Sequence, residues 1–303
     1  MSHVDVPPAL RRNVLESWGA AGERWLGELP GLLDAVVDAW SLVVEAPYVL
    51  SFNWVAAVRR ADGSPAVLKL GVPSSEHLAE EAAALTSFAG AGAVRLLDRD
   101  AGRGALLLER AHPGTMLRDL VPARDEEATA VAVGILRRLH VEPAAGGPLP
   151  DLVRYGGAFR RLPREHPLLP RRLVDRADRL FDELCATAPA RVVLHGDLHH
   201  GNILRAGREP WLAIDPHGVI GDPGYELAPL LYNPDPRHRD DGLLALVPAR
   251  LEQLADGLGI PLDRAVAWGF VGSVLSEVWT AEGGGTPGGR PLDVARLLEP
   301  RLP

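Results

Sequence analysis

Apolar runs separated by turn residues occupy the chain between residues 42 and 110. They are rich in Val, Leu and aromatic residues, a composition that favours β-strands. ADGSP interrupts the first run and predicts a hairpin turn at Asp62–Gly63. A helical pattern covers residues 73–88. The predicted strands lie in residues 42–72, 93–98 and 104–110.

Apolar positions beyond residue 116 recur with the period of helices. Spacings of i, i+3, i+4 and i+7 run from Ala128 to Leu139 and again from Leu173 to Cys185. Two short apolar runs, RVVL and WLAI, predict a small hairpin inside this helical part. Later helical segments are predicted at 243–258, 264–279 and 292–298.

The change of period predicts an α+β fold with two lobes. The first is a β-rich N-terminal lobe of residues 1–109, and AHPGT lies in a short hinge of residues 110–115. A mainly helical C-terminal lobe then spans residues 116–303. A chain of 303 residues, of which 47% are apolar, is long enough for two such cores.

Composition excludes several classes of protein. The net charge is −8 and no basic stripe is present, which argues against a nucleic-acid partner. Cys185 is the single cysteine, so no internal disulfide can form, and its place on an apolar stripe indicates an inert thiol. No apolar leader or membrane-spanning run is found, so a cytoplasmic protein without membrane partners is expected.

Lys69 is the only lysine among 32 basic residues. In a chain that uses arginine elsewhere, it indicates a site that needs a compact ammonium rather than a guanidinium fork. In the following helix, Glu81 lies beside the apolar face and Glu80 points roughly opposite. Glu81 is therefore the predicted partner of Lys69, and Glu80 is predicted to be solvated.

The segment LHGDLHHGNIL, residues 194–204, gathers polar side chains where a strand runs into a turn. Asn202 follows Asp197 by five residues, and Asp215 ends the WLAI strand. Two strands joined by a tight loop would bring these three side chains to one edge. Carboxylate and amide oxygens are hard ligands that suit Mg²⁺.

These residue types match the tasks of phosphoryl transfer. Asn202 and Asp215 are predicted to hold the metal, and Lys69, steadied by Glu81, to pair with phosphates. Asp197 is predicted to accept the proton of an attacking hydroxyl, acting as a general base. The interpretation requires Lys69 and these three oxygen-bearing side chains to converge on one nucleotide–metal complex.

HGDLHHGN resembles the H-x-D-x-x-x-x-N catalytic loop of the protein-kinase-like fold, in the form used by aminoglycoside phosphotransferases. DPHG at residues 215–218 stands where kinases carry D-F-G. RADGSPAVLKL, VRLLDRD, LLLER, GDPGYELAP and W-x-x-E make the chain similar to the streptomycin 6-kinase and hydroxyurea phosphotransferase group. The likeness covers residues 5–298.

The resemblance implies ATP, with GTP as an alternative, and Mg²⁺ as cofactors. It places the adenine near Glu109, Arg110 and His112. Ser51 and Asn53 stand where kinases have a glycine-rich loop and are implied phosphate contacts, although no glycine is present there.

The implied acceptor residues are Asp197, His200, Glu226, Trp279 and Glu282. Trp279 and Glu282 match the group's W-x-x-E-D, but Gly283 replaces the final acid. Local alternatives stay open: Glu226 and His195 brace the catalytic loop, His200 is solvated, Trp279 belongs to the core, and Glu282 is a solvated charge. Asp222 is predicted to cap a turn or helix.

The predicted function is ATP-dependent O-phosphorylation of a small cationic acceptor, most simply an aminoglycoside of the streptomycin type, which inactivates the antibiotic. Other acceptors are hydroxyurea or an amino sugar. A non-catalytic kinase-fold binding protein and a two-metal phosphoesterase are the rival classes; the second lacks the dispersed His and Asp motifs it needs. A monomer or weak dimer is expected.

Overall fold

The computed structural model describes residues 6–163 and 166–302. The chain forms two compact units. The first holds the chain up to Gly90 together with Val94–Ala111, and the second holds Ala91–Ala93 and the chain from His112 onward. The boundary at residues 111–112 lies inside the predicted linker of residues 110–115, whose role as a hinge stays a prediction.

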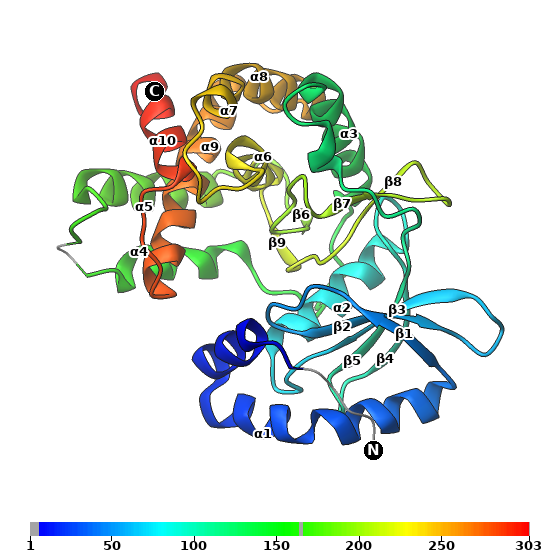
Figure 1. The fold of residues 1–303 in the computed structure, drawn as a ribbon. Coiled ribbons are helices and arrows are strands. Elements are labelled where there is room, and N and C mark those ends of the chain that lie inside the picture. The colour runs from blue at the N-terminus through cyan, green and yellow to red at the C-terminus, as the bar shows by residue number, and fades with distance from the viewer. Residues whose placement is uncertain (1–5, 164–165, 303) are drawn as a thin grey trace. The chain divides into compact units, whose positions relative to one another are not determined.

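A five-stranded antiparallel sheet forms the centre of the first unit (Figure 1). Its order is β1-β2-β3-β5-β4. Arg59 pairs with Pro65 across the predicted hairpin at Asp62–Gly63, which is confirmed. The strands are β1 (Val43–Pro47), β2 (Trp54–Arg59), β3 (Pro65–Leu70), β4 (Leu96–Asp100) and β5 (Ala105–Glu109).

The strand predicted at residues 93–98 begins later than expected. β4 starts at Leu96, because Ala93 is not part of this sheet. Ala93 belongs to the second unit and forms a parallel bridge there with Ala213. Ala93 is fully buried at this bridge, whereas the side chains of β4 are exposed or half-buried, so the apolar run did not show where the strand begins.

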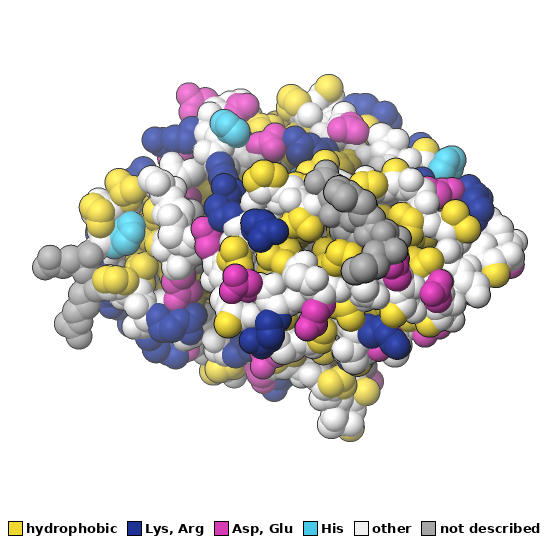
Figure 2. All heavy atoms as spheres, turned by 60° about the horizontal axis from the view of Figure 1, so that its bottom comes forward, with side chains coloured by type: hydrophobic (Ala, Val, Ile, Leu, Met, Phe, Trp, Pro, Cys, Tyr) yellow, Lys and Arg dark blue, Asp and Glu magenta, His cyan; other side chains and the backbone are white. Residues whose placement is uncertain are grey.

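Two helices complete the first unit. Helix α2 (Glu76–Phe88) lies where it was predicted. Helix α1 (Pro8–Trp40) was not predicted; it changes direction at Gly19, whose backbone has φ 49° and ψ −124°. Its buried residues join those of the sheet in one core cluster. Figure 2 views the molecule with the lower side of Figure 1 turned forward, and acidic and basic side chains are interspersed there without a continuous basic stripe.

The second unit is mainly helical, and α9 (Leu262–Glu282) lies at its centre. Residues on all sides of α9 are buried, as expected for a helix enclosed by others. The remaining helices are α3 (Asp125–Leu139), α4 (Gly157–Arg161), α5 (Arg171–Ala186), α6 (Leu227–Tyr232), α7 (Asp241–Ala245), α8 (Val247–Leu258) and α10 (Arg290–Leu298), with 3₁₀ turns η1 (Leu117–Leu120), η2 (Leu152–Gly156), η3 (Pro223–Glu226) and η4 (Glu299–Arg301).

The predicted hairpin between RVVL and WLAI is wrong in its pairing. Each strand instead pairs with a three-residue strand that was not predicted: β6 (Val192–Leu194) with β9 (Val219–Gly221), and β7 (Ile203–Arg205) with β8 (Trp211–Ala213). The segment predicted as one helix at 243–258 is likewise two, α7 and α8, which adjoin at Leu246.

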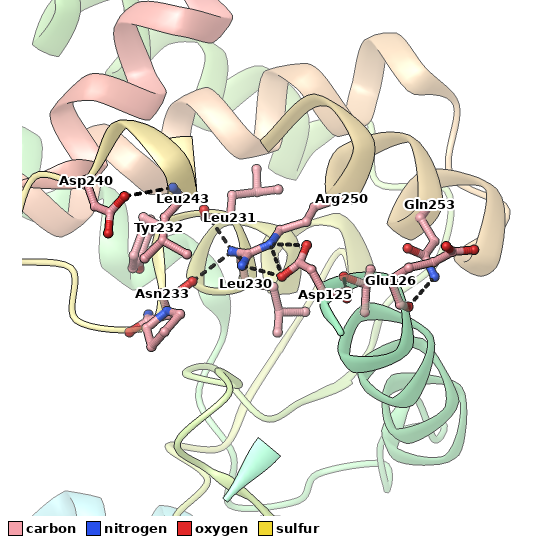
Figure 3. A network of polar contacts seen from close by, with 12 residues as sticks. Asp125, Glu126, Leu230, Leu231, Tyr232, Asn233, Asp240, Leu243, Arg250 and Gln253 are labelled. Carbon is pink, nitrogen blue, oxygen red and sulfur yellow. Dashed lines mark hydrogen bonds and ion pairs between the residues drawn. The ribbon is translucent and has the colours of Figure 1, made fainter. Parts of the chain in front are cut away.

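Arg250 joins three helices of the second unit through a fully buried guanidinium (Figure 3). It forms a bidentate ion pair with Asp125 of α3 and donates to the carbonyls of Leu230 and Asn233 at the end of α6. These contacts satisfy a charge that would be costly to bury alone. None of the helices within the described residues is long and apolar enough to cross a bilayer.

Candidate active site

Lys69 lies on the central strand β3 and is 6% exposed. Its ammonium is 2.6 Å from Glu81 Oε2 on α2, and Glu81 is 3% exposed. The predicted contact is therefore confirmed. Because both partners are buried, the attraction between their charges is stronger, and their geometry more constrained, than in a surface salt bridge.

Glu80 corrects a prediction. It was expected to be solvated, but it is only 6% exposed, and its carboxylate lies 3.8 Å from His77 Nδ1. The helical wheel places Glu80 away from the apolar stripe of α2, yet packing covers this side of the helix as well.

In the second unit, β6 delivers the chain to a tight turn at Gly196, which has φ +86°. The positive φ favours glycine, and a Cβ at Gly196 would also make a tight contact of 3.1 Å with the Cβ of His217. His195 is fully buried; its Nε2 lies 2.9 Å from the Ile214 carbonyl, and its Nδ1 accepts from the Asp197 amide. His195 therefore braces the turn.

Glu226 stabilises the same turn through hydrogen bonds to its backbone. Its carboxylate accepts hydrogen bonds from the backbone N–H groups of His195 and Gly196, and it is fully buried. A buried carboxylate committed to these two donors is a support of the loop, the alternative given above. Its contact with an acceptor stays a prediction, since the side chain is fully buried here.

Backbone contacts bring Asp197, Asn202 and Asp215 into one neighbourhood. The Asn202 side chain donates from Nδ2 to the Asp197 backbone carbonyl at 3.1 Å, and the backbone carbonyl of Asn202 accepts from Ile214 N at 2.9 Å. Asp215 is exposed and has φ +59°, a left-handed conformation that is uncommon outside glycine. Such outliers cluster at functional sites.

The surroundings of Asp197 carry excess negative charge. Burial, together with the charges of Asp215 and Glu226, raises its pKa to about 8. Burial raises the pKa of Glu226 to about 7. A cation at Asp215 and the Oδ1 end of Asn202 would neutralise part of this charge and lower the pKa of Asp197. The donor set, hard oxygens from one carboxylate and one amide, fits Mg²⁺.

No three His, Cys, Asp or Glu side chains gather as metal ligands within residues 6–163 and 166–302. A two-metal phosphoesterase needs such a cluster at each metal. The finding shows no such cluster among the described residues. It does not affect a Mg²⁺ site, which uses few protein ligands and is completed by phosphate oxygens.

The implied nucleotide residues already have partners of their own. Glu109 Oε2 accepts from the backbone N–H of Arg95, and Arg110 pairs with Glu45. His112 is exposed. Ser51 is also exposed, whereas the Oδ1 of Asn53 lies so close to Gly71 that a Cβ there would be 2.3 Å away. Their roles toward a nucleotide stay predictions.

The implied acceptor residues lie in different environments. His200 is 1% exposed, so the alternative that it is solvated is wrong, and its role toward an acceptor stays a prediction. The Trp279 ring is half-buried and meets Tyr155 edge to face at 5.3 Å. Glu282 forms a bidentate ion pair with Arg161. Trp279 and Glu282 therefore stay candidates, the second only after release from Arg161.

Two supporting residues were missed by sequence reasoning. Arg161 and Arg264 are two of many arginines, and nothing in their local pattern distinguishes them. Arg264 donates from two guanidinium nitrogens to Asp222 Oδ2, while Asp222 Oδ1 accepts from Gly224 N as the predicted cap of η3. Only the tertiary structure brings these partners together.

Residues 44–284 match the family described as aminoglycoside/hydroxyurea antibiotic resistance kinase. The chain belongs to this family. It is 35% identical to streptomycin 6-kinase of Streptomyces glaucescens over 93% of this chain and 92% of that protein. It is 38% identical to hydroxyurea phosphotransferase of Kitasatospora aureofaciens over 93% and 82%.

The fold of the chain is also found among solved structures. Choline kinase LicA from Streptococcus pneumoniae superposes with a TM-score of 0.61, covering 89% of this chain and 97% of that one at 14% identity. At this identity the likeness concerns the fold alone. It confirms the predicted α+β, kinase-like architecture.

The kinase is expected to be most stable near pH 6.5 when no metal is added. Burial lowers the pKa of four histidines to between about 3 and 4, so the unfolded chain binds more protons below pH 6.5 and stability falls as the pH drops. The raised pKa values of Asp197 and Glu226 act oppositely, and they prevail above pH 6.5 as the histidines of the unfolded chain lose their protons, so stability declines toward pH 8. The histidines are His140, His195, His199 and His200.

Urea denaturation between pH 4 and pH 8 measures this profile. The double variant Asp197→Asn with Glu226→Gln is expected to lose the decline above pH 6.5, because neither replacement titrates. A wild-type free energy of unfolding that keeps rising to pH 8 contradicts the raised carboxyl pKa values.

Proposed function

We propose that this kinase transfers the γ-phosphoryl group of ATP to a hydroxyl of a small cationic acceptor. The observation that carries the proposal is the neighbourhood of Asp197, Asn202 and Asp215, joined by the Asn202 and Ile214 hydrogen bonds. A proton acceptor and two metal-binding oxygens are the set that phosphoryl transfer requires.

The proposal assigns each residue of the site a role in phosphoryl transfer. Asp197 accepts a hydrogen bond from the acceptor hydroxyl. The hydroxyl oxygen forms a bond to the γ-phosphorus, the bond from that phosphorus to the bridging oxygen of ADP breaks, and the hydroxyl proton passes to Asp197. Lys69, held by Glu81, pairs with the phosphates of ATP. His195 and Glu226 keep the turn that carries Asp197 in place.

Asn202 and Asp215 would hold Mg²⁺, which when bound neutralises phosphate oxygens and assists departure of ADP. The side-chain nitrogen of Asn202 is used in the hydrogen bond to the Asp197 carbonyl. The side-chain oxygen, Oδ1, is therefore the atom of Asn202 that would bind the metal. The left-handed backbone of Asp215 directs its carboxylate differently from an extended strand residue.

Streptomycin or a related aminoglycoside is the first acceptor to test, in line with the name of the Streptomyces glaucescens relative. Hydroxyurea is the second, because the relative named for it is equally similar. The net charge of −8 favours encounter with a cation. Ion pairing of Glu282 with Arg161, and Gly283 in place of an acid, weaken the case for streptomycin itself.

An ADP-release assay over aminoglycosides, hydroxyurea and amino sugars tests the proposal. Turnover with at least one hydroxylated acceptor, dependent on added Mg²⁺, is the expected result. Nucleotide binding with no turnover on any member of the panel would instead favour a non-catalytic binding protein.

A further inference from the structure

The loop between β1 and β2 lies directly beside Lys69 within the first unit. Val55 of β2 pairs with Lys69, and Trp54 pairs with Leu70, so residues 49–53 begin two positions from the lysine along the neighbouring strand. At the end of the loop, Asn53 packs against Gly71, which follows β3. An anion held by Lys69 would therefore lie near this loop.

The loop has no glycine, and none of its residues has a positive φ. A glycine-rich loop is shaped by its backbone freedom, whereas this one must be held by its side chains and neighbours. Leu50 is 6% exposed and belongs to the core of the unit, while Val49 at the tip is fully exposed. Ser51 and Phe52 lie between Leu50 and Asn53 and receive contacts from outside the sheet.

Those contacts come from the first part of α1, residues 8–18, which we call the N-terminal arm. Asn13 Nδ2 donates to the Ser51 carbonyl at 3.1 Å. The Trp18 and Phe52 rings meet edge to face, with centroids 6.4 Å apart and planes at 84°. Ser51 and Phe52 of the loop thus each receive one contact from the N-terminal arm.

The arm is itself fixed against the rest of α1. The chain reverses at Gly19, and Gly22 lies against Val14 so closely that a Cβ on Gly22 would be 2.6 Å from the Val14 carbonyl oxygen. Leu10 and Val14 are fully buried. Figure 1 shows this dark blue start of α1 turned back along the remainder of the helix.

We propose that Asn13 and Trp18 are positioning residues that set the loop of residues 49–53 over the phosphates of the bound nucleotide. The inference rests on the proposed function, since it needs a nucleotide at Lys69. The hydrogen bond fixes the loop backbone at Ser51, and the ring contact fixes its direction at Phe52. Neither side chain touches the nucleotide itself.

Direct binding of ATP and of adenosine separates this role from a general effect on folding. Asn13→Ala and Trp18→Ala are expected to weaken ATP binding roughly three- to tenfold, the size of one lost aromatic or hydrogen-bond contact. Binding of adenosine, which has no phosphates, is expected to stay unchanged. Trp18→Phe keeps an aromatic partner for Phe52 and is expected to retain most of the ATP affinity.

Trp40→Ala is the matched control, because Trp40 is a half-buried tryptophan at the other end of α1. It is expected to lower the melting temperature without changing the ratio of ATP to adenosine affinity. Equal weakening of both ligands in the arm variants, or no weakening, overturns the inference while leaving the proposed function intact. If the wild type binds neither ligand, the proposed function fails, and this inference with it.

Discussion

Asp197→Asn is expected to lower kcat by about 10²- to 10⁴-fold, the usual contribution of a positioned general base. Asparagine has nearly the same shape, and the local hydrogen bonds to this residue use its backbone: its carbonyl accepts from Asn202, and its amide donates to His195. The turn should therefore keep its geometry. Steady-state ADP release with the best acceptor gives kcat, and a nearly unchanged KM for ATP is expected beside the loss.

Asp256→Asn serves as the control, because Asp256 is an exposed carboxylate on α8 with the same change of charge. It should retain wild-type turnover. Undiminished kcat in Asp197→Asn would refute the assignment of the base, whatever the effect on binding. The charge removed near Asp215 and Glu226 should also make the variant more stable than wild type above pH 7.

The parts of the site that could be predicted from the sequence are those whose residues lie in one short segment with a clear pattern. Lys69 and Glu81 were identified because a strand places the lysine and a helical period selects one of two neighbouring glutamates. The loop from His195 to Asn202 was identified because its residue types are concentrated in eight positions. In both cases the chemistry and the geometry come from the same short segment.

The misses come from contacts between distant segments. The three-residue strands β7 and β9 were missed, because such short strands carry too little periodicity to show their partners. β6 pairs with β9, and residues 195 and 217 also bond across the turn. His200 is polar and lies in a loop, yet it is buried. Arginines that pair with Asp125, Asp222 or Glu282 are separated from them by more than 40 residues.

The second prediction separates the stability that the Lys69–Glu81 pair contributes from its effect on catalysis. Lys69→Met leaves Glu81 buried without its ammonium partner and is expected to cost about 3–5 kcal/mol of unfolding free energy. It is also expected to lower kcat/KM for ATP by on the order of 10²–10³, the size of one lost electrostatic donor. Urea denaturation and ADP release measure the two effects on the same preparation.

Adding Glu81→Leu to Lys69→Met removes the second charge and fills the space with apolar atoms of similar size. Stability is expected to return close to that of the wild type, because replacing a buried pair as a whole is nearly neutral. Activity is expected to stay lost, since no ammonium remains to meet phosphate. Lys69→Arg, which keeps the charge but not the compact head, should also fail to restore turnover. Recovery of activity in the apolar double variant would mean that Lys69 serves only to balance Glu81 and never contacts the nucleotide.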